Sequence, residues 1–189
     1  MSSGVGGGRR ADAVRNRELA RDAAIALLSE PGSTITVETI AKRAGLGAGT
    51  VVRAFGGKDA LVDAAVASLL EPLVARARDL LARTSPEQAL RVFLAELIAF
   101  QAAHHTISEQ FGGLDLPATT TLRAELVQAV EDMIAGARRD GAVRTDLAPG
   151  VVAVLIGESA FAIARASGPS GGDLAAAYLT VLMDGLRPR

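Results

Sequence analysis

The stretch from Thr36 to Phe55, TVETIAKRAGLGAGTVVRAF, constrains the fold more than any other part of the chain. Thr36 can cap a helix, and apolar residues then recur at i, i+3, i+4 and i+7, which places them on one face: Val37, Ile40, Ala41 and Ala44. Ile35 and Ile40 have the spacing of a hydrophobic staple. Gly45 ends the helix, because glycine adopts the left-handed conformation without steric cost. The stretch therefore begins with one short amphipathic helix.

A second short helix follows after only Leu46 and Gly47. We expect it from about Ala48 to Phe55, with Val51 and Phe55 facing inward because they lie four residues apart. Two short helices joined by a three-residue turn that contains glycine form a helix-turn-helix, whose second helix can enter the major groove of DNA. The sequence thus predicts a recognition element near the amino end.

The segment from Gly45 to Leu61, GLGAGTVVRAFGGKDAL, resembles the signature of TetR-family transcriptional regulators, G-V-(S/G)-x-G-T-L-Y-x-H-F-x-x-K-(E/D)-x-L. Val52 and Ala54 depart from it, because the family usually has a tyrosine and a histidine there that contact DNA phosphates. This departure bears on affinity and operator register and leaves the fold unchanged. The remaining positions match outright or in kind: Gly45, Leu46, Gly47, Gly49, Thr50, Val51, Phe55, Lys58, Asp59 and Leu61.

The resemblance implies an all-α protein: an N-terminal three-helix domain that carries the helix-turn-helix, and a larger helical bundle that binds a ligand and dimerises. Composition agrees, because 49% of the residues are hydrophobic but only 3% are aromatic, so alanine, leucine and valine must form the core. We expect a disordered arm over residues 1–12, a DNA-binding domain over 13–58, and an effector-binding and dimerisation domain over 59–189. The arm is either a plain tail or a contact for DNA phosphates.

The helices expected outside the motif follow from apolar periodicity and from proline and glycine breaks. A long helix that Pro72 should kink links the two domains, and the segment from Thr106 to Thr121 reads as irregular. The expected helices are Ala13–Glu30, Lys58–Arg83, Pro86–His105, Leu122–Asp140, Val151–Ser167 and Asp173–Arg187.

Charge is distributed unevenly along the chain. Residues 1–58 contain nine basic and five acidic side chains, and the remaining residues contain eleven and sixteen. A basic amino-terminal domain, called the head below, joined to an acidic remainder, called the body, suits a protein that binds a polyanion. The chain has no cysteine, which excludes disulfides and thiolate chemistry and fits the cytoplasm. The most apolar run, Val151 to Ser167, contains Glu158 and Arg165 and is short for a bilayer, so we expect no membrane span.

The outward residues of the second helix are the candidate DNA contacts. Arg53 can bond guanine O6 and N7 together or bind a phosphate, and Val52 and Ala48 can touch a thymine methyl. Thr50 and Lys58 should position the head on phosphates, as should Thr36 and the amides at the helix start. The full predicted set is Thr36, Lys42, Arg43, Gly47, Ala48, Gly49, Thr50, Val52, Arg53 and Lys58.

Other chemistries find little support in the sequence. The glycine-rich run from Gly45 to Thr50 follows a helix and lacks G-K-(S/T), so it is neither a dinucleotide fingerprint nor a P-loop. His104 and His105 point about 100° apart on a helix and have no third ligand at a suitable spacing. No nucleophile–base set can be assembled. We therefore predict no metal, no cofactor and no enzymatic activity.

The resemblance also implies a small-molecule pocket in the body, with a hydrophobic or amphipathic effector. Its predicted wall, which could equally be ordinary core, is Phe93, Leu97, Phe100, His104, Phe111, Met133 and Phe161. The two apolar terminal helices suggest a homodimer closed by a four-helix bundle, or else a monomer core. A dimer would present its two heads about 34–36 Å apart, or a multiple of that distance.

Three functions remain open at this point. The first is a regulator, most often a repressor, that a small molecule releases from a palindromic operator. The second, which Val52 and Ala54 keep open, is a helical enzyme or ligand carrier that has lost DNA binding. The third is an architectural DNA binder whose affinity no small molecule changes.

Overall fold

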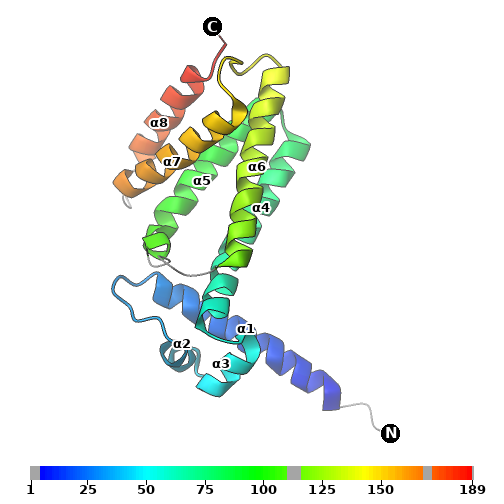
Figure 1. The fold of residues 1–189 in the computed structure, drawn as a ribbon, viewed down its shortest axis with the longest axis vertical. Helices are drawn as coiled ribbons and strands as arrows, with labels where there is room; N and C mark the ends of the chain where they lie inside the picture. The colour runs from blue at the N-terminus through cyan, green and yellow to red at the C-terminus, as the bar shows by residue number, and fades with distance from the viewer. Residues whose placement is uncertain (1–4, 110–115, 168–171, 189) are drawn as a thin grey trace. The chain divides into compact units, whose positions relative to one another are not determined.

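The computed structural model describes residues 5–109, 116–167 and 172–188, and within these ranges every regular element is an α-helix. The all-α prediction is confirmed (Figure 1). The helices are α1 (Val5–Leu28), α2 (Val37–Ala44), α3 (Ala48–Phe55), α4 (Lys58–Arg83), α5 (Pro86–Glu109), α6 (Pro117–Arg139), α7 (Pro149–Ser167) and α8 (Gly172–Gly185).

Helices α2, α3 and α4 have the bounds that the sequence predicts, and α4 continues through Pro72. Helix α5 also begins at the predicted Pro86 and α7 ends at the predicted Ser167, whereas the remaining helix ends differ from the prediction. Helix α1 begins at Val5, so residues 5–12, expected to be a disordered arm, are helical. Alanine and arginine favour helix there, and a helix extends more readily than it starts. Residues 1–4 of the arm lie outside the described residues.

The sequence predicted an irregular segment from Thr106 to Thr121, but both ends of this segment are helical. Helix α5 has non-helical backbone angles at His104, close to the predicted end, but then resumes as far as Glu109. Helix α6 begins at Pro117, because a proline in the first turn of a helix lacks only an N–H group that would have no partner there. The sequence placed the end of this helix at His105 because glycine and proline mark the segment that follows, and it did not predict the non-helical residue at His104.

Contacts divide the chain into two compact units. The first comprises Met1–Leu69 with Thr106–Thr120, and the second comprises Leu70–His105 with Thr121–Arg189. Helices α4, α5 and α6 therefore each contribute residues to both units. Besides the predicted 13–58 domain, the first unit contains residues 1–12, the first half of α4, the end of α5 and the start of α6. The assignment of DNA binding and effector binding to separate domains stays a prediction.

The core of the first unit consists of small and branched side chains. Helix α1 packs against α2 and α3, which also contact each other. Ala20 and Ala24 of α1 are buried, and so are the inward residues of α2 and α3. The fully buried members are Ala20, Ala24, Leu28, Ile40, Ala41, Val51, Leu61, Val62 and Ala65. This core determines which face of each short helix remains outside.

The second unit is a bundle in which α5, α7 and α8 share one apolar cluster. Ile98 of α5 packs with Ala160 and Ala164 of α7, and Tyr178 and Leu179 of α8 border them. Salt bridges join α4 to α5 (Arg76 Nη2–Glu96 Oε1, 2.9 Å) and α4 to α6 (Arg78 Nη2–Glu125 Oε2, 2.7 Å). The core therefore uses one side of each helix and leaves charged residues outside.

Helices α7 and α8 also expose large apolar side chains outside this cluster. Val154 is 60% exposed and Val181 is 72% exposed, and Val151, Leu155 and Leu174 accompany them. Helix α7 begins at Pro149, two residues before the predicted start, and by length and composition alone it could cross a membrane. Its 18-residue window has a mean hydropathy of 1.4, and 28% of it is buried. This surface has no cover within the described part of the chain.

Candidate nucleic-acid interface

Helix α2 is fixed at its start by reciprocal hydrogen bonds. The Thr36 hydroxyl accepts from the Thr39 N–H at 3.1 Å, and the Thr36 N–H donates to the Thr39 hydroxyl at 3.0 Å. This pair is a capping box, with a threonine in the place of the usual Glu or Gln. The predicted helix cap at Thr36 is confirmed. Its contact with a DNA phosphate stays a prediction, and the Thr36 hydroxyl, which donates to the Thr39 hydroxyl at 3.3 Å, would have to give up that bond to make it.

The turn between α2 and α3 depends on glycine. Gly45 has φ of 67°, in the left-handed region, and the Leu46 N–H donates to the Ala41 carbonyl at 2.9 Å. Gly47 then caps α3 in an extended conformation and has no side chain to hydrogen-bond the first amides. Those amides remain available to an anion at the start of the helix, where the helix dipole also favours negative charge.

Helix α3 has one buried and one exposed face. Val51 is 1% exposed, whereas Val52 is 44% exposed and Arg53, Gly47 and Gly49 are exposed with it. Of the other residues predicted on this face, Ala48 and Thr50 are half-buried. The predicted orientation of the helix is therefore largely confirmed, with a narrower outer surface than expected.

The Arg53 guanidinium points along this outer surface toward the start of α3. Its Nη2 donates to the Thr50 hydroxyl at 3.2 Å, and a Cβ on Gly49 would lie 3.4 Å from its Nη1. Gly49 therefore leaves room for the arginine head above the first turns of α3. The head group, the free amides of that turn and the exposed methyls of Val52 lie on one surface. Such a surface can contact both phosphates and base edges.

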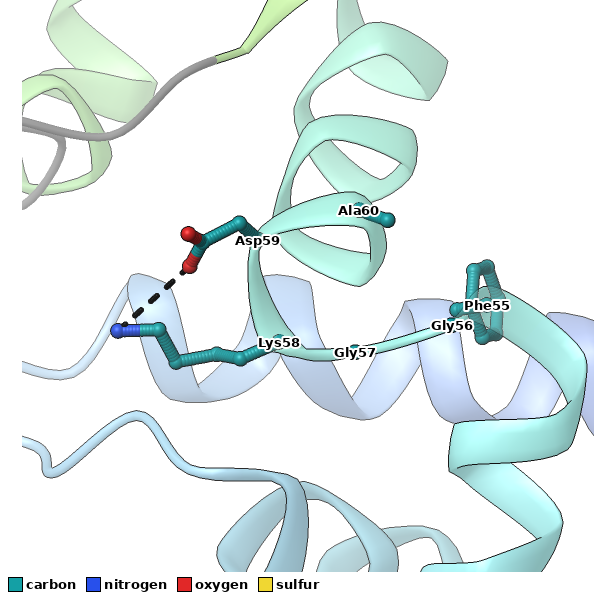
Figure 2. A pocket seen from close by; sticks show the side chains of 6 residues that line it. All are labelled: Phe55, Gly56, Gly57, Lys58, Asp59 and Ala60. Atoms are coloured by element: carbon teal, nitrogen blue, oxygen red, sulfur yellow. Dashed lines mark ion pairs between the residues drawn. The ribbon is translucent and has the colours of Figure 1, made fainter.

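The link from α3 to α4 forms a shallow hollow lined by Phe55 to Ala60 (Figure 2). Gly56 has φ of 91°, and its N–H donates to the Val52 carbonyl at 2.7 Å, which ends α3. Lys58 then opens α4, with its Nζ 3.8 Å from Asp59 Oδ1. Figure 2 shows both of these side chains on the same side of the turn. A lysine in loose contact with its neighbour can exchange that contact for a phosphate.

The remaining predicted basic residues differ in their contacts. Lys42 is exposed. Arg43 forms an ion pair with Glu30, so it already has a partner within the head. The guanidinium of Arg17, which is not among the predicted DNA contacts, lies over the Phe55 ring, 4.9 Å from the centroid. Phe55 is accordingly half-buried, with an arginine as part of its cover.

Asp63, which sequence reasoning did not single out, joins α4 to the start of α6. Its side chain is 7% exposed, and Oδ1 accepts from the Thr119 N–H at 2.8 Å and from the Thr119 hydroxyl at 2.7 Å. Oδ2 accepts from the Ala118 N–H at 2.9 Å. Burial raises the pKa of this carboxyl, but the three hydrogen bonds outweigh it and hold the pKa below its usual 3.8. The sequence feature that could have identified Asp63 is its position as an acidic residue within the apolar run LVDAAV.

The residues predicted to line a pocket come from three helices of the second unit. Phe93 of α5 and Met133 of α6 are fully buried, and Leu97, Phe100, His104 and Phe161 are half-buried. The His104 ring stacks on Phe100 with centroids 4.4 Å apart, and Nδ1 lies 2.8 Å from the Phe100 carbonyl oxygen. Phe111 lies outside the described residues. The pocket itself stays a prediction.

Two family models match the chain. Residues 20–65 match the model for bacterial regulatory proteins of the tetR family, and residues 85–188 match the C-terminal domain of SbtR-like transcriptional regulators. The second match spans more than half of the chain. The chain belongs to the TetR family. The resemblance in the segment from Gly45 to Leu61 is thereby confirmed, and this TetR-family protein is a ligand-responsive DNA-binding transcriptional regulator.

Solved structures agree with this assignment. A TetR transcription regulatory protein from Mycobacterium vanbaalenii is 32% identical over 94% of this chain and 98% of its own, with a TM-score of 0.64. A TetR transcriptional regulator from Streptomyces coelicolor is 28% identical over 91% and 98%, with a TM-score of 0.67. FadR from Bacillus subtilis, solved with stearoyl-CoA, shares the fold at 17% identity over 90% and 99%, with a TM-score of 0.75. Comparison with curated proteins finds no significant match.

The Asp63 hydrogen bonds predict a pH-dependent loss of stability in Asp63→Asn. The amide would present N–H groups to donors, so we expect unfolding by urea to become easier by about 1–3 kcal/mol at neutral pH. The folded pKa lies below the ordinary value, so this contribution is complete above that value and is lost as the pH falls through the folded pKa. The gap between wild type and variant should therefore shrink only below about pH 4.

Asp132→Asn is the matched control, because this exposed aspartate of α6 accepts, among the described residues, only from the Gln128 side chain. It should change the free energy of unfolding by less than about 0.5 kcal/mol. An Asp63→Asn variant as stable as this control at neutral pH would contradict the role of the carboxylate.

Proposed function

We propose that this regulator is a homodimeric repressor that binds a palindromic operator and leaves it when a small molecule binds the body. The observation that carries the proposal is the division of α3, with Val51 buried and Arg53 exposed on the opposite face. A helix held in this way can lie in the major groove with its outer residues toward the base edges. A cytoplasmic location follows from this function.

Arg53 and Val52 are the residues we assign to base reading. The guanidinium can bond guanine O6 and N7, or a neighbouring phosphate, and the valine methyls can contact a thymine methyl. Thr50, Lys58, Lys42 and the amides after Gly47 would hold the head on the backbone. Val52 and Ala54 cannot donate hydrogen bonds from their side chains, so phosphate binding must come from these other groups.

The effector is proposed to be hydrophobic or amphipathic and to bind among α5, α6 and α7. The predicted lining is apolar apart from His104, whose Nδ1 is already next to a helix carbonyl. FadR from Bacillus subtilis, which shares the fold, was solved with stearoyl-CoA, an amphipathic molecule. An apolar lining of this kind favours the binding of an acyl chain or ring system over that of a highly charged metabolite.

Asp63 offers a route by which the body could influence the head. Helix α6 contributes most of its length to the second unit, and its first residues are held by Asp63 near the start of α4. A ligand that displaces α6 would have to break these hydrogen bonds or carry Asp63 with it. It can shift the equilibrium only by the difference between its affinities for the two states.

The homodimer is proposed to form through α7 and α8. These helices expose Val151, Val154, Leu155 and Val181, which are apolar enough to favour association. Two-fold pairing of both helices would bury this surface in a four-helix bundle and would match a two-fold operator. Burial against a membrane is the competing explanation, but Glu158, which is exposed on α7, would then need to enter lipid.

The rival function is a ligand-binding protein or enzyme on the same scaffold that has lost DNA binding. Val52 and Ala54 are the features that favour it, because they remove two potential phosphate contacts. This rival predicts turnover or ligand binding without affinity for DNA.

Replacing the exposed arginine of α3 should weaken DNA binding. We expect wild type to bind the DNA upstream of its own reading frame saturably and with strong salt dependence in a fluorescence-anisotropy titration. Arg53→Ala should lose about 1–3 kcal/mol per head, which is about 5- to 150-fold in affinity for each head. Arg91→Ala, which removes an exposed arginine from α5, should bind as wild type does. Turnover of a substrate without DNA affinity would support the rival instead.

Charge placed on the exposed face of α7 or α8 should dissociate the dimer. Val154→Glu and Val181→Glu should each give a monomer by light scattering at micromolar concentration, because a carboxylate would be buried without a partner. Val127→Glu changes a valine of α6 that is 50% exposed, and this variant should stay dimeric. A monomeric wild type, or dimers in both variants, would contradict the proposed interface.

A further inference from the structure

The first helix extends well beyond the part of it that packs. Helix α1 begins at Val5, but its first fully buried residue is Ala20. All side chains from Gly8 to Arg15 are exposed. Figure 1 shows these turns continuing past α3, with no other helix of the first unit beside them. A helix that projects in this way carries its side chains into solvent next to the recognition helix.

Arginines on this helix fall on one stripe. Arg10, Val14, Arg17 and Arg21 are spaced at i, i+4, i+7 and i+11, and a helix of 3.6 residues per turn places such positions on one face. Arg15 lies about 140° around the helix from Arg10 at 100° per residue. The stripe is therefore a defined basic surface, and Arg15 is an arginine outside it.

The contact between Arg17 and Phe55 fixes where the stripe faces. Phe55 is the last residue of α3, and the Arg17 guanidinium lies 4.9 Å from its ring centroid. The stripe therefore runs beside the carboxyl end of the recognition helix. Arg10 lies on it seven residues earlier, which is about 10 Å farther along the α1 axis at 1.5 Å per residue.

The acidic residues of α1 do not neutralise every arginine of the stripe. Arg21 Nε lies 3.8 Å from Asp22 Oδ1, so this arginine has a neighbouring carboxylate. Asp12 and Glu18 lie on other faces of the helix. Among the described residues, neither Arg10 nor Arg17 forms a salt bridge with an acidic side chain. Two positive charges next to the recognition helix therefore remain available to a polyanion.

We propose that the stripe of Arg10 and Arg17 is a further DNA-backbone contact, with Arg10 binding a phosphate beyond those reached from α3. The Phe55 ring holds Arg17 in place, so little side-chain freedom is lost when a phosphate binds beside it. Arg10 extends the contact along the duplex backbone. Neither residue reads sequence, so the contact adds affinity equally for every operator. This inference rests on the proposed DNA binding and adds a second contacting helix to it.

The test is the salt dependence of binding by the full chain. Fluorescence anisotropy with duplex DNA from upstream of its own reading frame gives the slope of log K against log salt concentration for wild type, Arg10→Ala and Arg15→Ala. Each lost phosphate contact should reduce the slope by about 0.9. We expect Arg10→Ala to show this reduction for each bound head, with equal loss of affinity on operator and unrelated DNA, and Arg15→Ala to keep the wild-type slope.

Two outcomes would overturn the inference. If Arg10→Ala and Arg15→Ala lower the slope equally, the effect is one of net charge and the stripe has no special role. If neither changes the slope while wild type binds, α1 does not touch the backbone. Absence of binding by wild type is a separate result that contradicts the proposed function itself. Both variants lie at exposed helix positions, so their helical content should match wild type by circular dichroism.

Discussion

Burial of Val51 in the core where α1, α2 and α3 pack together is the constraint on which the rest of the head depends. Helix α3 has only eight residues and would not be stable alone, so its rotation about its own axis is set by what it buries. With Val51 inside, Val52 and Arg53 must face outward. The left-handed glycines Gly45 and Gly56 end α2 and α3 closely enough for this small core to close. Packing therefore determines, as much as polar chemistry does, which residues of α3 can read DNA.

Helices α4, α5 and α6 each run from one compact unit into the other. Helix α4 leaves the head directly after Gly57, and Asp63 on its second turn holds the start of α6. A carboxylate that accepts three hydrogen bonds in a buried place resists displacement, because each broken bond would leave a polar group without a partner. In our account this connection makes the position of the head sensitive to events along α6.

The sequence predicted those features whose causes are local. The bounds of α2 and α3 follow from Thr36, Gly45 and Gly56, each of which acts within a few residues. The exposed face of α3 followed from helical periodicity alone. The extension of α1 to Val5 was missed because a glycine run lowers helix propensity, and the resumption of α5 after His104 was missed because glycine and proline mark the segment that follows.

Sequence patterns could not predict contacts between residues that are far apart in the chain. Asp63 and Thr119 are far apart in the chain, and nothing in either segment alone specifies their pairing. The stacking of Arg17 on Phe55 likewise depends on how α1 crosses α3. The apolar faces of α7 and α8 were visible as composition, but only the structure distinguishes the buried residues, such as Ala160 and Ala164, from exposed Val154 and Val181.

The most direct test of the central claim is photo-crosslinking from the outer face of α3 to DNA. A photoreactive amino acid at Val52 should crosslink to bases within each half-site, and the same probe at Arg91, on the body, should not. Crosslinks at Val52 that map to two symmetric positions would support major-groove docking of α3. Efficient crosslinking from Arg91 together with none from Val52, in a protein that still binds the duplex, would contradict it.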